Sequence, residues 1–439
     1  MTEPNRLQRI SHLDTIRGLA VMGILMSNIQ DFGGCSIIPP SSLKPTFSGP
    51  HAHLNYILFI LQQMVFSSKT RGLLAMIFGA GALLLLQRVE AQHGKRRASQ
   101  IFVRRHLWMI VMGLLHAFFL WDGDFLASYG VVGLVLLYVC RRLSAKTLIV
   151  AGILITLFPG SYALMYFHPG ALEDVGLAGR VAVAGVEQRL GKPLNASEAA
   201  SISAWKQGLV PTHLPGDVLE EKARDGQKGY SARLHQKLSE YFRLEVRLIS
   251  VVLFETGGMA LLGMGLLKVG FLTGELSKKA YIWTAVLGLL ASFPLLGLGL
   301  WEIIKADLPR ELVTCWIDLP QQFTRIGATL AYTALIVLWV RSGRLKPVTA
   351  AFNSVGRMAL TNYLMTSALC QFVFAWGPWK LFGELEYYQL FWCMLGVWTV
   401  NLALSTLWLR HFAFGPIEWL WRSLTYAKIP SMMLRNVER

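Results

Sequence analysis

The sequence predicts an all-α integral membrane protein, a polytopic bundle of about ten spans with a short re-entrant or interfacial helix. Of its 439 residues, 54% are hydrophobic and only 15% are charged, whereas soluble domains carry about a quarter charged residues. The hydrophobic residues gather in long runs, and roughly 18 such residues can cross a hydrocarbon core of about 30 Å. The net charge of +16 comes largely from short loops between the runs. That pattern orients a multispanning chain and does not indicate nucleic acid as a partner.

Loop charges set the expected topology. Basic residues precede the first apolar run and fill the loop over 88–105, so both regions, and both termini, are expected inside. An even number of crossings must therefore lie between the two regions. Two predicted spans, over 16–32 and 72–88, meet this requirement. The run "NYILFILQQMVF" at 55–66 is too short to cross and is expected to be the re-entrant or interfacial helix. The later spans are expected at 105–121, 125–140, 146–166, 247–267, 280–301, 321–340, 355–376 and 388–409.

Three regions follow from this pattern. Residues 1–167 are expected to form an N-terminal membrane bundle, in which "GAGALLLL" at 79–86 indicates close helix packing. Residues 168–246 are polar and are expected to form an extracytoplasmic loop. Its amphipathic helix would present one apolar face, made by Leu234, Leu238 and Tyr241. Residues 247–439 are expected to form the C-terminal membrane domain.

Polar groups inside the predicted spans are the candidates for function, since such groups usually face a bundle interior or a wet cavity. In "LLHAFFLWDGD", Asp124 follows His116 by eight residues, or about two helical turns, so the two share a face if the helix continues. A carboxylate that orients a histidine is typical of a general base. The alternative is that His116 bonds a neighbouring helix and the aspartates cap the next one.

A second set of residues is a candidate for substrate binding. Asp14 and Arg17 form either a local ion pair or a site at which Arg17 meets an anionic ligand. Arg357, at the start of the span over 355–376, would join Arg104 and Arg105 in a basic mouth for phosphate, unless these arginines only follow the positive-inside rule. The remaining candidates are Glu255, Asn362, His51 and His53. No metal site is predicted, because "HAH" at 51–53 has no cysteine or acidic cluster beside it.

Several motifs carry a resemblance to a known family. "RISHLDTIRGLAVMGILMSNI", "GLLHAFFLWDGDFLASYGVVGL" and "NSVGRMALTNYLMTS" resemble the YeiB-like family of bacterial inner-membrane proteins, whose C-terminal part is a domain of unknown function. The opening stretch is also similar to the first span of membrane acyltransferases of the heparan-alpha-glucosaminide N-acetyltransferase and acyltransferase-three types. This resemblance implies a multi-pass protein of the bacterial inner membrane that takes acyl groups from cytoplasmic coenzyme A, with Arg17 at the donor end. Asn28 stands where the acyltransferase-three type has a histidine, so that role falls to His116 or to His51 and His53.

Two functions are therefore carried forward. In the first, a membrane acyltransferase binds acyl-CoA at Arg17 and Arg357. His116, oriented by Asp124, takes a proton from the acceptor, and Asn28 steadies the oxyanion. In the second, a proton-coupled small-molecule transporter uses His116, Asp124, Glu255 and Arg325. A third function, that of a purely structural membrane protein, is disfavoured because such a protein would gain little from buried ionisable groups. The expected partners are membrane lipids and small-molecule donors or acceptors. The identity of the acceptor, and whether the chain acts alone or as a homo-oligomer, stay open.

Overall fold

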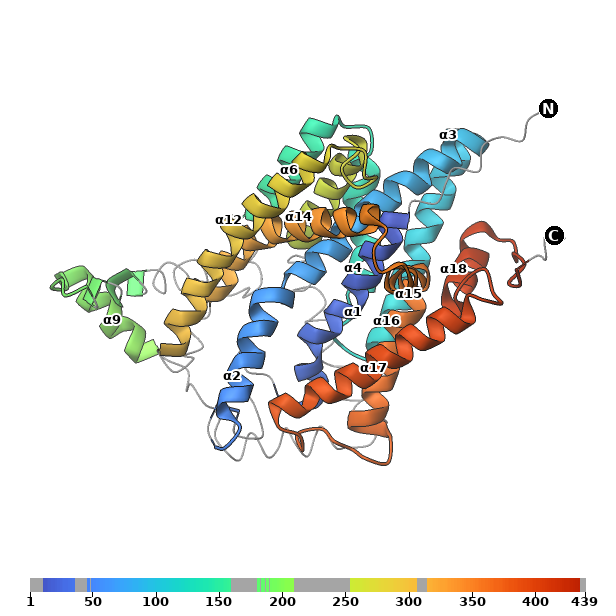
Figure 1. The fold of residues 1–439 in the computed structure, drawn as a ribbon. Coiled ribbons are helices and arrows are strands. Elements are labelled where there is room, and N and C mark those ends of the chain that lie inside the picture. Colours follow the sequence, from blue (N-terminus) through green and yellow to red (C-terminus); the bar gives the residue numbers. More distant parts are fainter. Residues whose placement is uncertain are drawn as a thin grey trace.

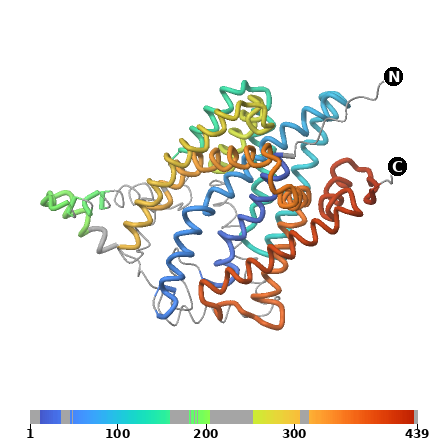
Figure 2. The backbone as a smooth tube through the Cα atoms, in the orientation of Figure 1, coloured from blue at the N-terminus to red at the C-terminus, as the bar shows by residue number. Residues whose placement is uncertain are grey.

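The computed structural model describes residues 11–35, 46–47, 49–158, 253–305 and 314–434 and most of 180–208. Within these ranges the regular structure is helical, as predicted, and β-pairing is limited to an isolated bridge between Phe412 and Met433. Helix α1 (Ser11–Gly33) runs through the middle of the bundle in Figures 1 and 2. It contacts α3 (Lys69–Phe119), α15 (Lys346–Arg357) and α17 (Tyr387–Trp408).

Length and apolar composition identify four helices in the described residues that could cross a membrane, or five if one bent pair counts as a span. The four are Ala52–Phe119, Lys278–Lys305, Trp316–Ser342 and Tyr387–Trp408. The prediction of ten spans with both termini inside is therefore not supported. One reason is that Leu126–Cys140 and Ala145–Leu157 are shorter apolar helices. Another is that the predicted spans over 146–166 and 247–267 lie partly outside the described residues.

The predicted short helix over 55–66 is present but is joined to a longer helical run. It consists of α2 (Ala52–Leu61) and the π-helical turn η1 (Gln62–Phe66), and α3 follows. Gln62 and Gln63 are buried, and the Gln62 amide donates to the Met26 carbonyl over 2.8 Å. The expected loop over 88–105 is also helical, except that α3 turns at Gly94, where φ is 77°. The positive φ at this turn is a conformation that glycine adopts readily.

Close helix contacts bring the polar residues together. A Cβ atom at Gly79 would lie 2.0 Å from the Ala260 carbonyl oxygen, which confirms the close packing predicted for "GAGALLLL". A Cβ at Gly356 would lie 1.8 Å from the Asp14 carbonyl oxygen, so α15 crosses α1 with their backbones almost touching. Only glycine permits this approach, and it places Arg17 beside the C-terminal end of α15.

The predicted span over 355–376 is interrupted. The chain bends by 85° between α15 and the helix over Ala359–Trp376, which comprises α16 (Ala359–Gln371) and η4 (Phe372–Trp376). The prediction that Arg357 begins a span is wrong, because Arg357 ends the separate helix α15. The bend places its guanidinium at a corner between two helices.

The remaining helices complete the bundle, while the amphipathic helix predicted around Leu234 and Tyr241 lies outside the described residues. The other elements used below are α4 (Leu126–Val132), a helix over 253–268, α12 (Lys278–Lys305), α14 (Leu319–Ser342) and α18 (Pro416–Tyr426).

Candidate functional site

His116 and Asp124 are in direct contact inside the protein. His116 Nδ1 lies 2.8 Å from Asp124 Oδ1, and both side chains are fully buried. The two residues do not meet along a continuing helix. Helix α3 ends at Phe119, the amides of Leu120 and Trp121 both bond to the His116 carbonyl, and the chain turns back. The contact therefore depends on the turn rather than on helical spacing.

The Asp124 side chain also caps the next helix, α4, which begins two residues later at Leu126. Its Oδ2 accepts a hydrogen bond from the Ala127 amide over 2.9 Å, which satisfies one of the free amides at the start of α4. Gly113 makes room for this turn, because a Cβ there would lie 2.1 Å from Ala127 N and 2.7 Å from Asp124 Oδ2. The sequence left open whether this aspartate orients His116 or caps the next helix. In the structure Asp124 does both.

The second nitrogen of His116 faces a serine. His116 Nε2 lies 2.9 Å from Ser367 Oγ on α16, and the Tyr363 hydroxyl donates to Asp124 Oδ1 over 3.2 Å. With the proton on Nδ1, directed at the carboxylate, Nε2 accepts from the serine hydroxyl. Sequence analysis missed both Ser367 and Tyr363. The available signal was the cluster of polar residues one turn apart in "TNYLMTSALC", in an otherwise apolar helix.

A cavity of about 500 Å³ adjoins this array, a volume in the range that holds small-molecule ligands. It is lined by side chains from several helices. Its charged lining residues are Arg17, Arg71, Arg105, Arg325, Arg357, Glu255, Asp318 and Glu418. Within the described residues, five arginines thus face three carboxylates. Excess positive charge between low-dielectric walls favours an anionic ligand.

Three of the arginines predicted to receive phosphate share this cavity. Arg17 Nη1 lies 2.7 Å from Asp14 Oδ1, so the predicted ion pair exists and Arg17 still lines the cavity. The guanidinium of Arg105 lies 3.5 Å from the ring centre of Trp421 on α18. Arg357 donates to a backbone carbonyl on the segment before α18. Arg104 is not among the lining residues and bonds instead to a carbonyl of α18.

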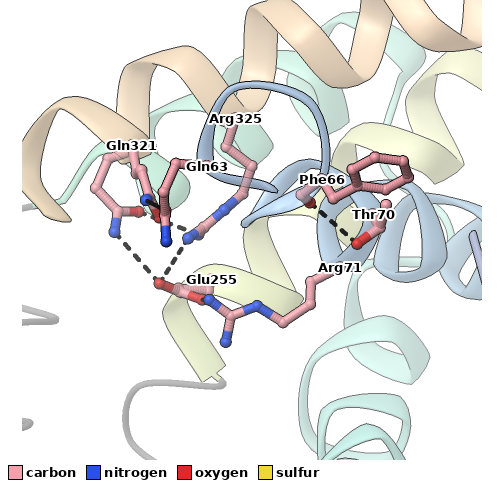
Figure 3. A network of polar contacts seen from close by, with 8 residues as sticks. Gln63, Phe66, Thr70, Arg71, Glu255, Gln321 and Arg325 are labelled. Atoms are coloured by element: carbon pink, nitrogen blue, oxygen red, sulfur yellow. Dashed lines mark hydrogen bonds and ion pairs between the residues drawn. The ribbon is translucent and has the colours of Figure 1, made fainter. Parts of the chain in front are cut away.

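A charged network forms another part of the lining (Figure 3). Glu255 accepts a hydrogen bond from Arg325 over 2.8 Å, and Arg71 lies 4.0 Å from its other oxygen. The Arg325 side chain is only 2% exposed. The helix over 253–268, α3 and α14 each contribute one of these side chains, so the network ties three helices together and keeps their charges at the cavity surface.

Asn28 shares a small cavity with the serine, Ser367. This second cavity is also lined by Thr366 and Tyr363 and has a volume of about 10 Å³, a space of about one water molecule. Tyr363 lines both cavities. Val21 and Ile24 of α1 also line both, so these three residues border the arginine-lined cavity and the space next to the serine.

The other predicted residues lie elsewhere. Asn362 is buried and its amide donates to Ser405 Oγ over 2.8 Å, a contact that joins α16 to α17. His51 Nδ1 lies 3.0 Å from Glu386 Oε2, and His53 is exposed. None of the three predicted residues lines either cavity.

Comparison with known proteins places the chain among uncharacterised relatives. Residues 266–428 match the family model described as a protein of unknown function, DUF418. The uncharacterized protein YeiB of Escherichia coli K12 is 29% identical over 430 residues, which cover 95% of this chain and 97% of YeiB. The uncharacterized protein YxaH of Bacillus subtilis 168 is 28% identical over 432 residues, with 95% and 94% covered. No solved structure matches. The chain is thus similar to YeiB and YxaH, both uncharacterized, along nearly its whole length, and its C-terminal part matches a family of unknown function.

Proposed function

We propose that this protein is a multi-pass protein of the bacterial inner membrane that transfers an acyl group from a cytoplasmic acyl-CoA-type donor to an acceptor at or across the membrane. One observation carries the proposal. The side chain of Tyr363 lines the arginine-lined cavity and also contacts the buried pair: its hydroxyl donates to Asp124 Oδ1 over 3.2 Å, and its ring centre lies 4.9 Å from that of His116. An anion-binding chamber next to an oriented base is the arrangement that acyl transfer from a phosphorylated carrier requires.

The donor end of the proposed reaction is the cluster of Arg17, Arg105 and Arg357. Guanidinium groups bind phosphate oxygens through paired N–H donors, and these bonds are shorter and stronger than bonds between neutral groups. The three arginines come from α1, α3 and α15, so they can surround a phosphate from different sides. In the proposed orientation these residues lie toward the cytoplasm, as the basic residues over 88–105 favour.

The reactive end is His116. The Asp124 carboxylate holds Nδ1 and leaves Nε2 as the proton acceptor, which is how a carboxylate orients a histidine base. Asn28 lines the small cavity next to it. An amide N–H at that position could donate to the oxyanion that develops when the thioester carbonyl is attacked.

The experiment is acyl transfer by membranes that contain the protein, with acetyl-CoA as the donor. We expect His116→Ala to abolish transfer while the protein retains its yield and melting temperature. His93→Ala, which changes an exposed histidine that lines neither cavity, is the matched control and should transfer normally. Full activity of His116→Ala would remove the histidine from the reaction.

The charged network of Glu255, Arg71 and Arg325 favours a second candidate, a proton-coupled transporter. Buried ionisable groups that line a cavity are found in proton and substrate pathways. Flux of a solute into proteoliposomes in the absence of any acyl donor would support transport. Transfer of acetyl groups without such flux would support the acyltransferase.

A further inference from the structure

We infer that Ser367 is a catalytic nucleophile that carries the acyl group as an ester between donor and acceptor. This inference rests on the proposed acyl transfer and adds a covalent intermediate to it. Its basis is the row of three buried residues, Asp124, His116 and Ser367, which as whole residues are 1%, 2% and 2% exposed. Because Nε2 already bonds the serine hydroxyl at 2.9 Å, the proton that His116 can take without rearrangement is the one on Ser367.

The hydrogen bonding of Ser367 favours this role over a packing role. A serine that only packs inside a helix can bond the carbonyl one turn earlier. Here the distance from Ser367 Oγ to the Tyr363 carbonyl is 3.5 Å, whereas the distance to His116 Nε2 is 2.9 Å. The imidazole is therefore the closer partner, and it belongs to a different helix, 251 residues away in the chain.

Asp124 is placed to hold the imidazole in the required state. Its two oxygens accept from His116 Nδ1, from the Ala127 amide and from the Tyr363 hydroxyl. These donors come from α3, α4 and α16, so the carboxylate cannot rotate away without losing contacts to three elements. A fixed carboxylate keeps the proton on Nδ1 and leaves Nε2 free to accept one from Ser367.

The reacting carbonyl would enter at the small cavity that Ser367 lines. The serine borders the small cavity with Asn28, and Tyr363 borders that cavity and the large one. Val21 and Ile24 also border both cavities, so a thioester held among the arginines would reach Ser367 Oγ by passing between Tyr363 and these two side chains of α1. The Asn28 amide would then face the developing oxyanion.

The chemistry balances without any redox partner. In the first half, Ser367 Oγ attacks the thioester carbonyl and His116 Nε2 takes the hydroxyl proton. The carbon–sulfur bond then breaks, and the leaving thiolate takes the proton from His116. In the second half, an acceptor hydroxyl or amine attacks the serine ester and gives its proton to His116. The ester bond breaks, and His116 returns the proton to Ser367 Oγ.

The test traps the intermediate. Purified full-length protein in lipid nanodiscs is incubated without an acceptor, with acetyl-CoA in one arm and p-nitrophenyl acetate in the other. The activated ester needs no recognition of coenzyme A. Intact mass and peptide mapping are expected to find one acetyl group on Ser367 in both arms and none in Ser367→Ala, with acylation retained in Ser367→Cys. Ser292→Ala is the matched control, since Ser292 is a buried serine that donates to a carbonyl, and it should be acetylated like the wild type. Acylation in His116→Ala should be slower by roughly 10²- to 10⁴-fold.

The outcomes separate the inference from the proposed function. Acylation of Ser367 by the activated ester but not by acetyl-CoA would support the nucleophile and refute the donor. Transfer from acetyl-CoA that continues in Ser367→Ala, with no serine adduct in the wild type, would overturn the inference and leave acyl transfer standing. An adduct on another residue, or none in either arm from protein with a normal melting temperature, would also overturn it.

Discussion

Replacing Asp124 by asparagine tests how His116 is oriented, at almost constant side-chain volume. The carboxylate accepts hydrogen bonds from His116 Nδ1 at 2.8 Å, from the Ala127 amide at 2.9 Å and from the Tyr363 hydroxyl at 3.2 Å. An amide offers one oxygen and one NH₂ group, so it cannot accept at both positions. If the oxygen caps Ala127, the NH₂ group faces Nδ1 and drives the imidazole proton to Nε2. The histidine would then donate to Ser367 instead of accepting from it.

The expected loss of rate for Asp124→Asn is on the order of 10⁴-fold, the size found when an aspartate-to-asparagine change leaves the wrong tautomer in such an array. The lost hydrogen bonds to a charged group should also lower the free energy of unfolding by about 1.5–3 kcal/mol. The assay is the rate at which p-nitrophenyl acetate acylates the purified protein, with the melting temperature measured in parallel. Asp122→Asn changes an exposed aspartate two residues away and should leave the rate unchanged. A folded Asp124→Asn protein that is acylated at the wild-type rate would refute the orientation of His116 by this carboxylate.

Three further changes have definite expected outcomes. Gly356→Ala would place a Cβ 1.8 Å from a carbonyl oxygen of α1, so the yield of monodisperse protein should fall sharply. Gly396→Ala should be tolerated, because a Cβ there would have no heavy atom within 4 Å beyond its own stretch of helix. Glu255→Gln leaves the buried guanidinium of Arg325 without its carboxylate partner at 2.8 Å, which should lower the free energy of unfolding by roughly 3–5 kcal/mol. The melting temperature should therefore fall in Glu255→Gln and be restored when Arg325→Met is added. Arg105→Gln removes one cation from the cavity, and calorimetry should find acetyl-CoA binding weakened by about tenfold or more. Unchanged affinity would exclude Arg105 from the donor site.

The sequence by itself determined the helical, membrane-like character of this protein, because long apolar runs can satisfy their backbone polar groups in lipid only as helices or closed barrels. It also singled out residues that line the cavity, such as Arg17 and Arg357, and the pair of His116 and Asp124. Charge inside an apolar run is costly, so each of these residues was conspicuous in the sequence alone. Close packing at Gly79 was likewise evident from the local pattern of small residues.

Only the tertiary structure decided which of these residues meet. Ser367 was one of several polar residues on an apolar helix, and its contact with His116 joins positions 251 residues apart. The bend of 85° after α15 and the turn that returns Asp124 to His116 also lay beyond local patterns. Hydropathy and helical spacing indicate which face of a single segment is apolar and which is polar. The partner across a helix interface depends on how separate segments pack, and here that packing is set by near contact of backbones at Gly113 and Gly356.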